Sequence, residues 1–462
     1  MSYAHLLRRR CRTSTPPAVL LRSAEAYVPA NFFRNAFVNA LFALFAVHAV
    51  AIPVLLHTVF GTPRADTLVG HVDRFARMSQ SADSWRPMEA ARHTATTNPN
   101  ADLYDEIFFE RKVKFQYAPT SLLYIDGLSR AGLNRISWTA VWITAIVTAL
   151  VFRDHVRRMT RTIAPRDPSS ETALMAIAVA LSLTYYPLLK GYTLGQIQVW
   201  VDALFACFVW AWSRGAHTGA GVLLGLACLI KPPLAPIAIW ALVRGHWRMA
   251  AGAAGVGAAG LTASIAAYGI RSHLSYPQVL AYIGARGETY YPNQSFNGLL
   301  NRLFRNGENL EFLDHAFSPL HPWVRAGTLL AACVLLGLAL ALAAHRKVGT
   351  DRFELPVIAI TATIVSPIAW EHHYGILLPL LAVLVPACLD VSWRRRRTAV
   401  WLAAAFLLTG QYFHIAQRTA DTAWNLLQSY VLFGALMILA AAYAGALRAR
   451  WAMTAAGHPP GR

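Results

Sequence analysis

Chemically reactive side chains concentrate in a polar stretch that runs from Asp83 to Pro119. It begins with DSWRPMEAARH and continues, after a polar linker, as DLYDEIFFERKVKFQYAP. The stretch is rich in acidic and aromatic residues and is bracketed by strongly apolar segments. A carboxylate within hydrogen-bond reach of a reacting group can accept its proton. We therefore expect the chemistry of the protein to lie in this loop, held by an apolar frame.

The composition of that frame is typical of a membrane protein. Of the 462 residues, 56% are hydrophobic and 14% are charged, and the mean hydropathy is +0.38. Soluble domains carry about 25% charged residues. Apolar runs of membrane-spanning length recur along almost the whole sequence. The sequence therefore predicts an all-α polytopic membrane protein without a separate soluble domain.

The positive charge follows a membrane topology and not a nucleic-acid surface. The chain has 42 Lys and Arg residues against 23 Asp and Glu residues, which gives a formal net charge of +19. The arginines cluster in short connections between apolar runs, as in the run 394–397, and this pattern is typical of cytoplasmic loops. A nucleic-acid binder would gather basic and aromatic residues on one soluble surface. We therefore expect no nucleic-acid partner.

The cysteine pattern argues against disulfide bonds or a cysteine metal cluster in the polar loops. Cys11 lies in the basic N-terminal tail, and the other four of the five cysteines lie in apolar runs. These four are Cys207, Cys228, Cys333 and Cys388. Because the long polar loops contain no cysteine, no disulfide framework can hold them.

The alternation of apolar runs and basic connections predicts roughly 10 to 12 transmembrane helices. The upper number applies if the apolar region 171–243 holds four short crossings, and the lower one if it contains re-entrant segments. Outside that region, spans are expected at 36–60, 135–152, 248–270, 323–344, 355–369, 375–391, 398–416 and 425–447. This topology predicts two long loops on the non-cytoplasmic side, at about 61–134 and 271–322. Residues 36–447 would form one transmembrane domain, between cytoplasmic tails at 1–35 and 448–462.

This topology brings polar residues from distant parts of the chain to one non-cytoplasmic surface. They are Asp83, Tyr104, Tyr117, Gln196, Lys231, Arg286, Gln294, Asn297, Arg302, Glu371, His372 and His373. Ionisable residues near membrane depth are costly and usually functional. We therefore expect the functional site at this surface.

The ordered motifs that contain these residues resemble those of a known family. They are Asp83-Ser84-Trp85 with Glu89-Ala90-Ala91, Leu103-Tyr104-Asp105 before Tyr117-Ala118-Pro119, Gly195-Gln196 with Lys231-Pro232, Asn293-Gln294-Ser295 with Arg302, and the run from Ser366 to Tyr374. Over roughly residues 36–447 the chain resembles the membrane glycosyltransferases of superfamily C, and family 87 in particular. That family includes polyprenol-phosphate-mannose-dependent mannosyltransferases and related arabinofuranosyltransferases.

The resemblance implies transfer of mannose or arabinofuranose from a polyprenyl-phosphate donor to a lipid-linked or cell-envelope glycan acceptor. The site would face the non-cytoplasmic side of the cell membrane, and the transfer would invert the anomeric centre without a cofactor or metal. A carboxylate would take the proton of the acceptor hydroxyl, and cations would stabilise the phosphate leaving group. The candidate base is Asp83. The candidate phosphate contacts are Lys231, Arg286, Arg302, His372 and His373, and the candidate substrate-binding residues are Tyr104, Tyr117, Gln196, Gln294, Asn297 and Glu371.

Several of these residues have structural alternatives. Asp83 would also suit the N-cap of a helix that begins at Trp85. With a different alignment of the loop, Asp73 or Asp66 would be the base. Lys231 would also suit snorkelling to the membrane interface. The tyrosines would suit an interfacial aromatic belt, and the amides and Arg302 would suit ordinary hydrogen bonding within loops.

The types of side chain near residue 371 also raise the question of a metal site. Glu371, His372, His373 and Asp83 are all ligand types. Adjacent histidines at a helix end point in different directions, however, and the sequence has no HxxxH or HExxH spacing there. The histidines would otherwise pack and hydrogen-bond at a turn.

Two other functions fit the same composition. A transporter or flippase of lipid-linked sugars would also contain broken helices and intramembrane polar residues, and a non-catalytic subunit of an envelope-assembly complex is a further alternative. A transporter would place its polar breaks near the membrane midplane in both halves of a repeat. Here the predicted breaks collect on one face beside a loop that contains a carboxylate, which favours an enzyme.

Overall fold

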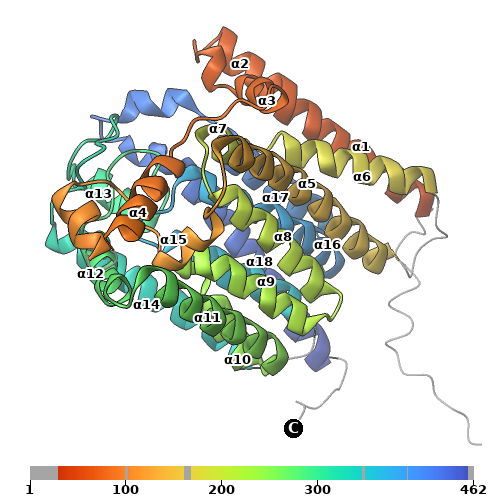
Figure 1. Ribbon diagram of the computed structural model, residues 1–462. Helices are drawn as coiled ribbons and strands as arrows, with labels where there is room; N and C mark the ends of the chain where they lie inside the picture. The colour runs from red at the N-terminus through yellow and green to blue at the C-terminus, as the bar shows by residue number, and fades with distance from the viewer. Residues whose placement is uncertain (1–29, 99–101, 161–167, 346–348, 393, 456–462) are drawn as a thin grey trace, which may run out of the picture.

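The chain folds into a bundle of helices, most of which run alongside one another (Figure 1). This computed structural model describes residues 30–98, 102–160, 168–345, 349–392 and 394–455. Within these ranges the regular structure is helical, apart from one isolated bridge between Asn293 and Trp370. The predicted all-α class is confirmed. The tail segments 1–29 and 456–462 lie outside the described residues.

The helices of the first half are α1 (Ala30–Ala46), α2 (Ile52–Thr58), α3 (Leu68–Ala76), α4 (Trp85–Thr97), α5 (Arg130–Thr160), α6 (Pro168–Leu183), α7 (Tyr186–Leu194), α8 (Gln198–Ser213) and α9 (His217–Ile230). Those of the second half are α10 (Pro236–Arg244), α11 (Trp247–Tyr268), α12 (Arg271–Arg286), α13 (Phe296–Leu303), α14 (Pro322–Ala344), α15 (Asp351–Ile364), α16 (Leu377–Val391), α17 (Arg395–Gly410) and α18 (Tyr430–Ala455). Short irregular turns of helix join several of them: η2 (Val47–Ala51), η3 (Arg64–Asp66), η4 (Asp105–Glu110), η5 (Pro119–Tyr124), η6 (Pro232–Leu234), η7 (Glu371–Ile376), η8 (His414–Thr419) and η9 (Asn425–Ser429).

Six described segments are long and apolar enough to cross a membrane. They are Ala36–Thr58, Arg130–Met159, Trp247–Tyr268, Pro322–Ala344, Glu371–Val391 and Asn425–Trp451. The pair α6 and α7, bent by 49°, would make a seventh, and the apolar helices α8, α9 and α10 are shorter. The protein is therefore a polytopic membrane protein. The total of ten to twelve crossings, which includes the shorter helices, stays a prediction.

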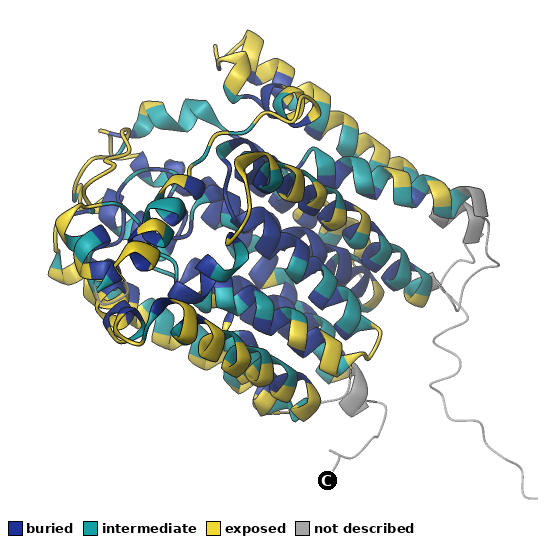
Figure 2. Cartoon of the chain, viewed as in Figure 1, coloured by how far each residue is buried: buried dark blue, intermediate teal, exposed yellow. Residues whose placement is uncertain are grey.

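Burial differs sharply between the centre and the outside of the bundle (Figure 2). In the segment Glu371–Val391, which contains α16, 83% of the apolar window is buried, against 11% for Ala36–Thr58. The outward side chains are themselves apolar, and Leu330 of α14 and Val400 of α17 are 65% and 64% exposed. A surface of this kind suits contact with lipid, because large apolar patches are rare on soluble monomers.

Two local features shape the connections of the bundle. The polar run 190–198 predicts a helix break, but α7 continues to Leu194 and ends at Gly195, whose φ of +69° is left-handed. A separate bend falls at residues 184–185, between α6 and α7. The short apolar stretch 119–132 predicts an interfacial helix, but it forms only the short turn η5, and α5 already begins at Arg130.

The helix connections gather at two ends of the bundle. At one end the α7–α8, α9–α10 and α15–α16 connections line a single cavity together with both long polar loops. At the other end, a hollow of about 500 Å³ is lined by His155, Ser213, His217, Asp351 and Asp390, which lie at or near the opposite ends of their helices. This separation agrees with the alternation of sides that the basic connections predict.

We predict that these two ends lie on opposite sides of the membrane. The test introduces one cysteine into a background without the five native cysteines. The two positions are Glu308, which is exposed in the second long loop, and Ala216, which is exposed in the α8–α9 connection. The variants are Glu308→Cys and Ala216→Cys. In intact cells, a membrane-impermeant maleimide should label the Glu308→Cys variant and not the Ala216→Cys variant. In permeabilised cells it should label both variants. Equal labelling of both in intact cells would contradict the topology.

Candidate active site

A cavity of about 1260 Å³ lies at the end of the bundle that carries α4 and α12 (Figure 1). Seven of the twelve candidate residues line it: Asp83, Tyr117, Gln196, Lys231, Glu371, His372 and His373. They come from the first long loop and from three helix connections that are far apart in the sequence. The fold therefore brings these seven residues together.

Asp83 is positioned by main-chain hydrogen bonds to the connection between α7 and α8. The Asp83 N–H donates to the carbonyl oxygen of Leu194 at 2.9 Å. On either side of it, Ser81 N–H donates to Thr193 O at 2.9 Å and Ser84 N–H donates to Gly195 O at 3.2 Å. Three consecutive carbonyls are thus paired with one short segment, and the carboxylate position is fixed by the backbone.

The Asp83 side chain faces the cavity and accepts a hydrogen bond from the Gln196 side-chain amide. Burial against the cavity walls raises the pKa of Asp83, and the Gln196 hydrogen bond opposes this shift because it stabilises the carboxylate. Gln196 is held in turn: its Oε1 accepts from Ser84 Oγ at 2.6 Å and from Tyr117 Oη at 3.2 Å. These neighbours fix which end of the amide faces Asp83.

The structure can be compared with the alternatives for Asp83, which are a helix-capping role and replacement as the base by Asp73 or Asp66. Ser84 occupies the N-cap position of α4 and no side chain caps that helix. Asp73 is exposed on α3 and forms an ion pair with Arg77 at 3.0 Å. Asp66 lies in η3, and neither of these two aspartates belongs to the cavity lining.

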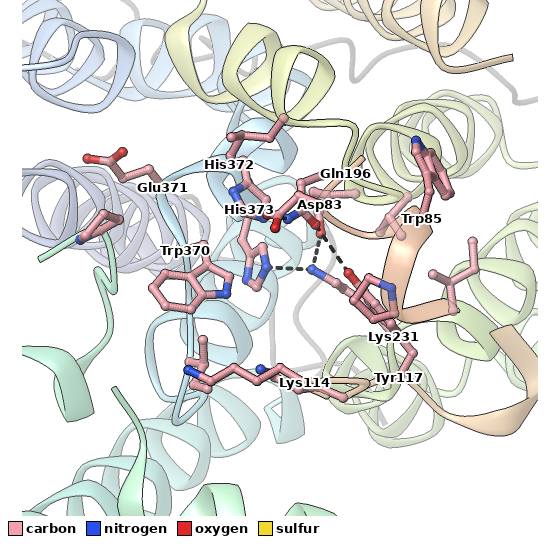
Figure 3. A pocket seen from close by; sticks show the side chains of 18 of the residues that line it. Asp83, Trp85, Lys114, Tyr117, Gln196, Lys231, Trp370, Glu371, His372 and His373 are labelled. Atoms are coloured by element: carbon pink, nitrogen blue, oxygen red, sulfur yellow. Dashed lines mark hydrogen bonds between the residues drawn. The ribbon is translucent and has the colours of Figure 1, made fainter. Parts of the chain in front are cut away.

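Lys231 lies at the C-terminal end of α9 and points at two neutral groups. Its Nζ lies 2.6 Å from Gln198 Oε1, to which it donates, and 2.6 Å from His373 Nε2 (Figure 3). Both partners line the cavity. Because neither partner is a carboxylate, Lys231 makes no contact ion pair in the described part of the chain.

Glu371 is buried, with 1% of its surface exposed, and points away from Lys231 (Figure 3). Its carboxylate accepts from Tyr430 Oη at 2.9 Å and from Tyr186 Oη at 3.2 Å. The next residue, His372, is also buried, and its Nε2 has no hydrogen-bond partner among the described residues. An orphaned buried nitrogen beside a cavity is available to a bound ligand.

Two lysines that sequence reasoning missed also line the cavity, Lys114 and Lys190. Both are close enough to Asp83 to interact with it through charge. Lys190 lies on α7, one turn before the Gly195 break, and its position inside an apolar run was the available signal. Lys114 lies among several charged residues of the first loop, so that nothing in the sequence distinguishes it from a solvated lysine.

Lys114 joins the two long loops. Its Nζ lies 2.5 Å from Glu288 Oε1 and stands 4.3 and 4.5 Å from the ring centroids of Phe312 and Phe317. Burial raises the pKa of Glu288 to about 7 and lowers the pKa of Lys114, while the ion pair opposes both shifts. This contact connects the loop that carries Asp83 to the loop on the opposite side of the cavity.

Five candidate residues lie outside the cavity lining. Arg302 is 1% exposed and donates to Asn293 O at 2.9 Å and to Ser429 Oγ at 2.7 Å. The others make internal contacts as well: Gln294 donates to Tyr291 O and Gln428 O, Asn297 to Thr328 Oγ1, and Tyr104 to Tyr117 O, while the Arg286 guanidinium stacks 3.9 Å from the centroid of the Tyr282 ring. These contacts hold the loops that form the cavity.

A metal site is not formed by the residues that the structure describes. Within these ranges, no three His, Cys, Asp or Glu side chains come together in a group that could hold an ion. The requirement for a metal or cofactor therefore stays a matter for experiment, and the expectation of none stays a prediction.

The fold and the cavity define a class: a polytopic, all-helical membrane protein with a deep site that combines carboxylates with several cations. Residues 115–367, more than half of the chain, match glycosyltransferase family 87. The chain belongs to this family and is a membrane glycosyltransferase.

One curated relative is a polyprenol-phosphate-mannose-dependent alpha-(1-2)-phosphatidylinositol pentamannoside mannosyltransferase of Mycolicibacterium smegmatis. It is 26% identical to this chain over 332 residues, which cover 68% of this chain and 72% of the relative. The expected resemblance to family 87 is confirmed.

We predict that Gln196→Leu moves the acidic limb of the activity profile to higher pH. A base works only when it is deprotonated, so with Asp83 as the expected base, activity should fall as the pH drops through its pKa. Removing the Gln196 amide removes the largest contribution that lowers this pKa, and the pKa should rise further. The measurement is kcat/KM for sugar transfer as a function of pH.

The matched control for this test is Ser81→Ala. The Ser81 hydroxyl donates to the carbonyl oxygens of Thr193 and Leu194 and not to the Asp83 carboxylate. The acidic limb of the Ser81→Ala pH profile should coincide with that of the wild type. If the Gln196→Leu profile also overlays the wild type, Asp83 does not set the acidic limb.

We predict that Arg302→Met lowers the apparent Tm of the purified protein by about 5–10 °C, because it leaves several buried loop carbonyls without a donor. Thermal unfolding in detergent measures this. The control is Arg305→Met, because the Arg305 side chain is exposed and its guanidinium donates to Asp421 O at 3.4 Å. An Arg302→Met protein with normal Tm but weakened donor binding would instead assign Arg302 to the phosphate.

Proposed function

We propose that this glycosyltransferase moves a sugar, mannose or arabinofuranose, from a polyprenyl-phosphate donor to a lipid-linked or cell-envelope glycan acceptor. The observation that carries the proposal is the Asp83 carboxylate in a cavity lined by three lysines. A mannose donor is favoured because the Mycolicibacterium smegmatis relative is polyprenol-phosphate-mannose-dependent. Transfer would take place at the non-cytoplasmic face of the cell membrane.

Asp83 is proposed as the general base of a single displacement. The acceptor hydroxyl oxygen forms a bond to the anomeric carbon while the bond from that carbon to the phosphate oxygen breaks. The hydroxyl proton passes to the Asp83 carboxylate, and polyprenyl phosphate leaves with the bonding electron pair. Attack from the face opposite the phosphate inverts the anomeric centre. The backbone pairing of Asp83 supports this role, since a base must be held in one place.

The cations in the cavity fit the leaving group. A phosphate gains charge as the sugar bond breaks, and fixed positive groups stabilise that charge best in a site from which water is excluded. Lys231 and Lys190 are free of contact ion pairs in the described part of the chain. His372 and His373 complete this side of the cavity. We assign the donor phosphate to these residues.

An apolar side of the same cavity fits the prenyl chain. It is formed by Ile230 and Leu234 beside Lys231, by Leu280 and Ile283 of α12, and by Ile368 after α15. Leu280 is 43% exposed. Apolar side chains of this kind in the cavity lining would suit the prenyl chain of a lipid donor.

We predict that Asp83→Asn lowers the rate of transfer by about 10²–10⁴-fold, the range for loss of a general base, and leaves the Tm unchanged. The measurement uses purified protein in nanodiscs, a panel of radiolabelled polyprenyl-phosphate sugars and an envelope lipid extract. The sugar that is transferred identifies the donor.

Asp73→Asn and Asp66→Asn are the matched controls, because these aspartates lie outside the cavity lining. Both variants should keep near wild-type transfer. Near wild-type transfer by Asp83→Asn would overturn the base assignment, and its loss in one of the controls would move the base to that residue. Transfer from none of the polyprenyl-phosphate sugars would contradict the proposed donor class.

A further inference from the structure

A buried carboxylate stands behind Lys231 and is connected to it by one amide. Asp202 lies on α8, four residues after Gln198, so both side chains project from the same face of the helix. Gln198 Nε2 donates to Asp202 Oδ1 at 2.7 Å, and Gln198 Oε1 accepts from Lys231 Nζ at 2.6 Å. The three side chains form one continuous hydrogen-bonded chain that ends at the cavity.

The carboxylate determines which way the amide points. The Gln198 NH₂ group faces Asp202, whose Oδ1 accepts its hydrogen bond. The Gln198 carbonyl oxygen must then face the opposite way, toward Lys231. Because Lys231 only donates, the orientation imposed by Asp202 is the one that holds the ammonium group. With the reverse orientation, two donors would face each other.

Placing the Asp202 carboxylate in this position costs free energy, because it is buried away from water. It is 1% exposed, and its Oδ2 has no hydrogen-bond partner among the described residues. A Cβ atom at Gly375 would overlap the carboxylate, so the backbone of η7, which carries His373, lies directly against it. An apolar side chain of similar volume would avoid this cost of desolvation. Packing and stability alone therefore do not account for a carboxylate here.

We propose that Asp202 is a positioning residue for the donor phosphate, acting through Gln198 on Lys231. This inference rests on the proposed function, in which Lys231 contacts that phosphate. Gln198 and His373 occupy two of the three N–H groups of Lys231. The third N–H is then directed to the bound phosphate. Asp202 itself touches neither substrate nor phosphate.

The experiment measures binding of polyprenyl phosphate, with neutral polyprenol as the comparison ligand, to purified protein in nanodiscs. Asp202→Leu should weaken binding of polyprenyl phosphate about tenfold and leave polyprenol binding unchanged. Lys231→Met should do the same. Because Asp202 acts through Lys231, the double variant should bind no more weakly than Lys231→Met alone.

Two further variants separate positioning from folding. Asp202→Asn keeps an oxygen that accepts from Gln198, so it should bind polyprenyl phosphate within about twofold of the wild type. Gln198→Met breaks the same chain without touching Asp202 and should weaken binding as Asp202→Leu does. It also serves as the test if Asp202→Leu does not fold.

The outcomes distinguish this inference from the proposed function. Effects of Asp202→Leu and Lys231→Met that multiply in the double variant, or an equal loss of polyprenol binding, would overturn the positioning role and leave the transferase proposal intact. Unchanged binding in Lys231→Met would remove the phosphate contact and the inference together. Absence of sugar transfer by a wild type that binds polyprenyl phosphate would instead contradict the proposed function.

Discussion

The site depends on main-chain pairing between the first long loop and the broken connection of α7 and α8. When a helix ends inside a membrane protein, its last carbonyl groups need partners that lipid cannot supply. Here the carbonyls of residues 193–195 accept from the N–H groups of residues 81, 83 and 84. Gly195 allows this approach, because its φ is +69° and a Cβ atom there would overlap the Ser81 carbonyl oxygen. The same bonds that end α7 therefore place Asp83 in the cavity.

The second long loop is attached in the same manner to the connection of α15 and α16. Gln294 N–H donates to Ala369 O at 2.7 Å, and Glu371 N–H donates to Pro292 O at 3.0 Å. Arg302 lies behind this loop and binds its carbonyls, including Asn293 O. Each long loop is thus paired, main chain to main chain, with one helix connection. Lys114 and Glu288 then join the two loops to each other.

Much of the architecture was readable from the sequence, because lipid imposes long apolar runs and basic connections mark one side. The same constraint made Lys231 and His373 visible as polar residues at the ends of such runs, and Asp83 was visible at the start of a polar stretch between two of them. Lys114 was not visible, since an ion pair within a polar loop depends on the packing of two distant segments. Arg302 and Gln294 were visible as polar residues, but the carbonyls that they bind follow from the loop conformation, which no periodicity encodes.

Two of the three cavity lysines, Lys190 and Lys231, remain available to an anion, whereas Lys114 pairs with Glu288. Asp83 is bound by the Gln196 amide, Glu371 by two tyrosine hydroxyls, and Asp202 is separated from Lys231 by the Gln198 amide. In each case a neutral group donates to the carboxylate, and none of the three makes a contact ion pair in the described part of the chain. Direct pairing would neutralise each lysine and would have to be broken before a phosphate could bind. Neutral partners stabilise the carboxylates at no such cost, and the carboxylates still lower the repulsion among the cations. Without a ligand, the site is therefore arranged to bind a negative charge that the ligand supplies.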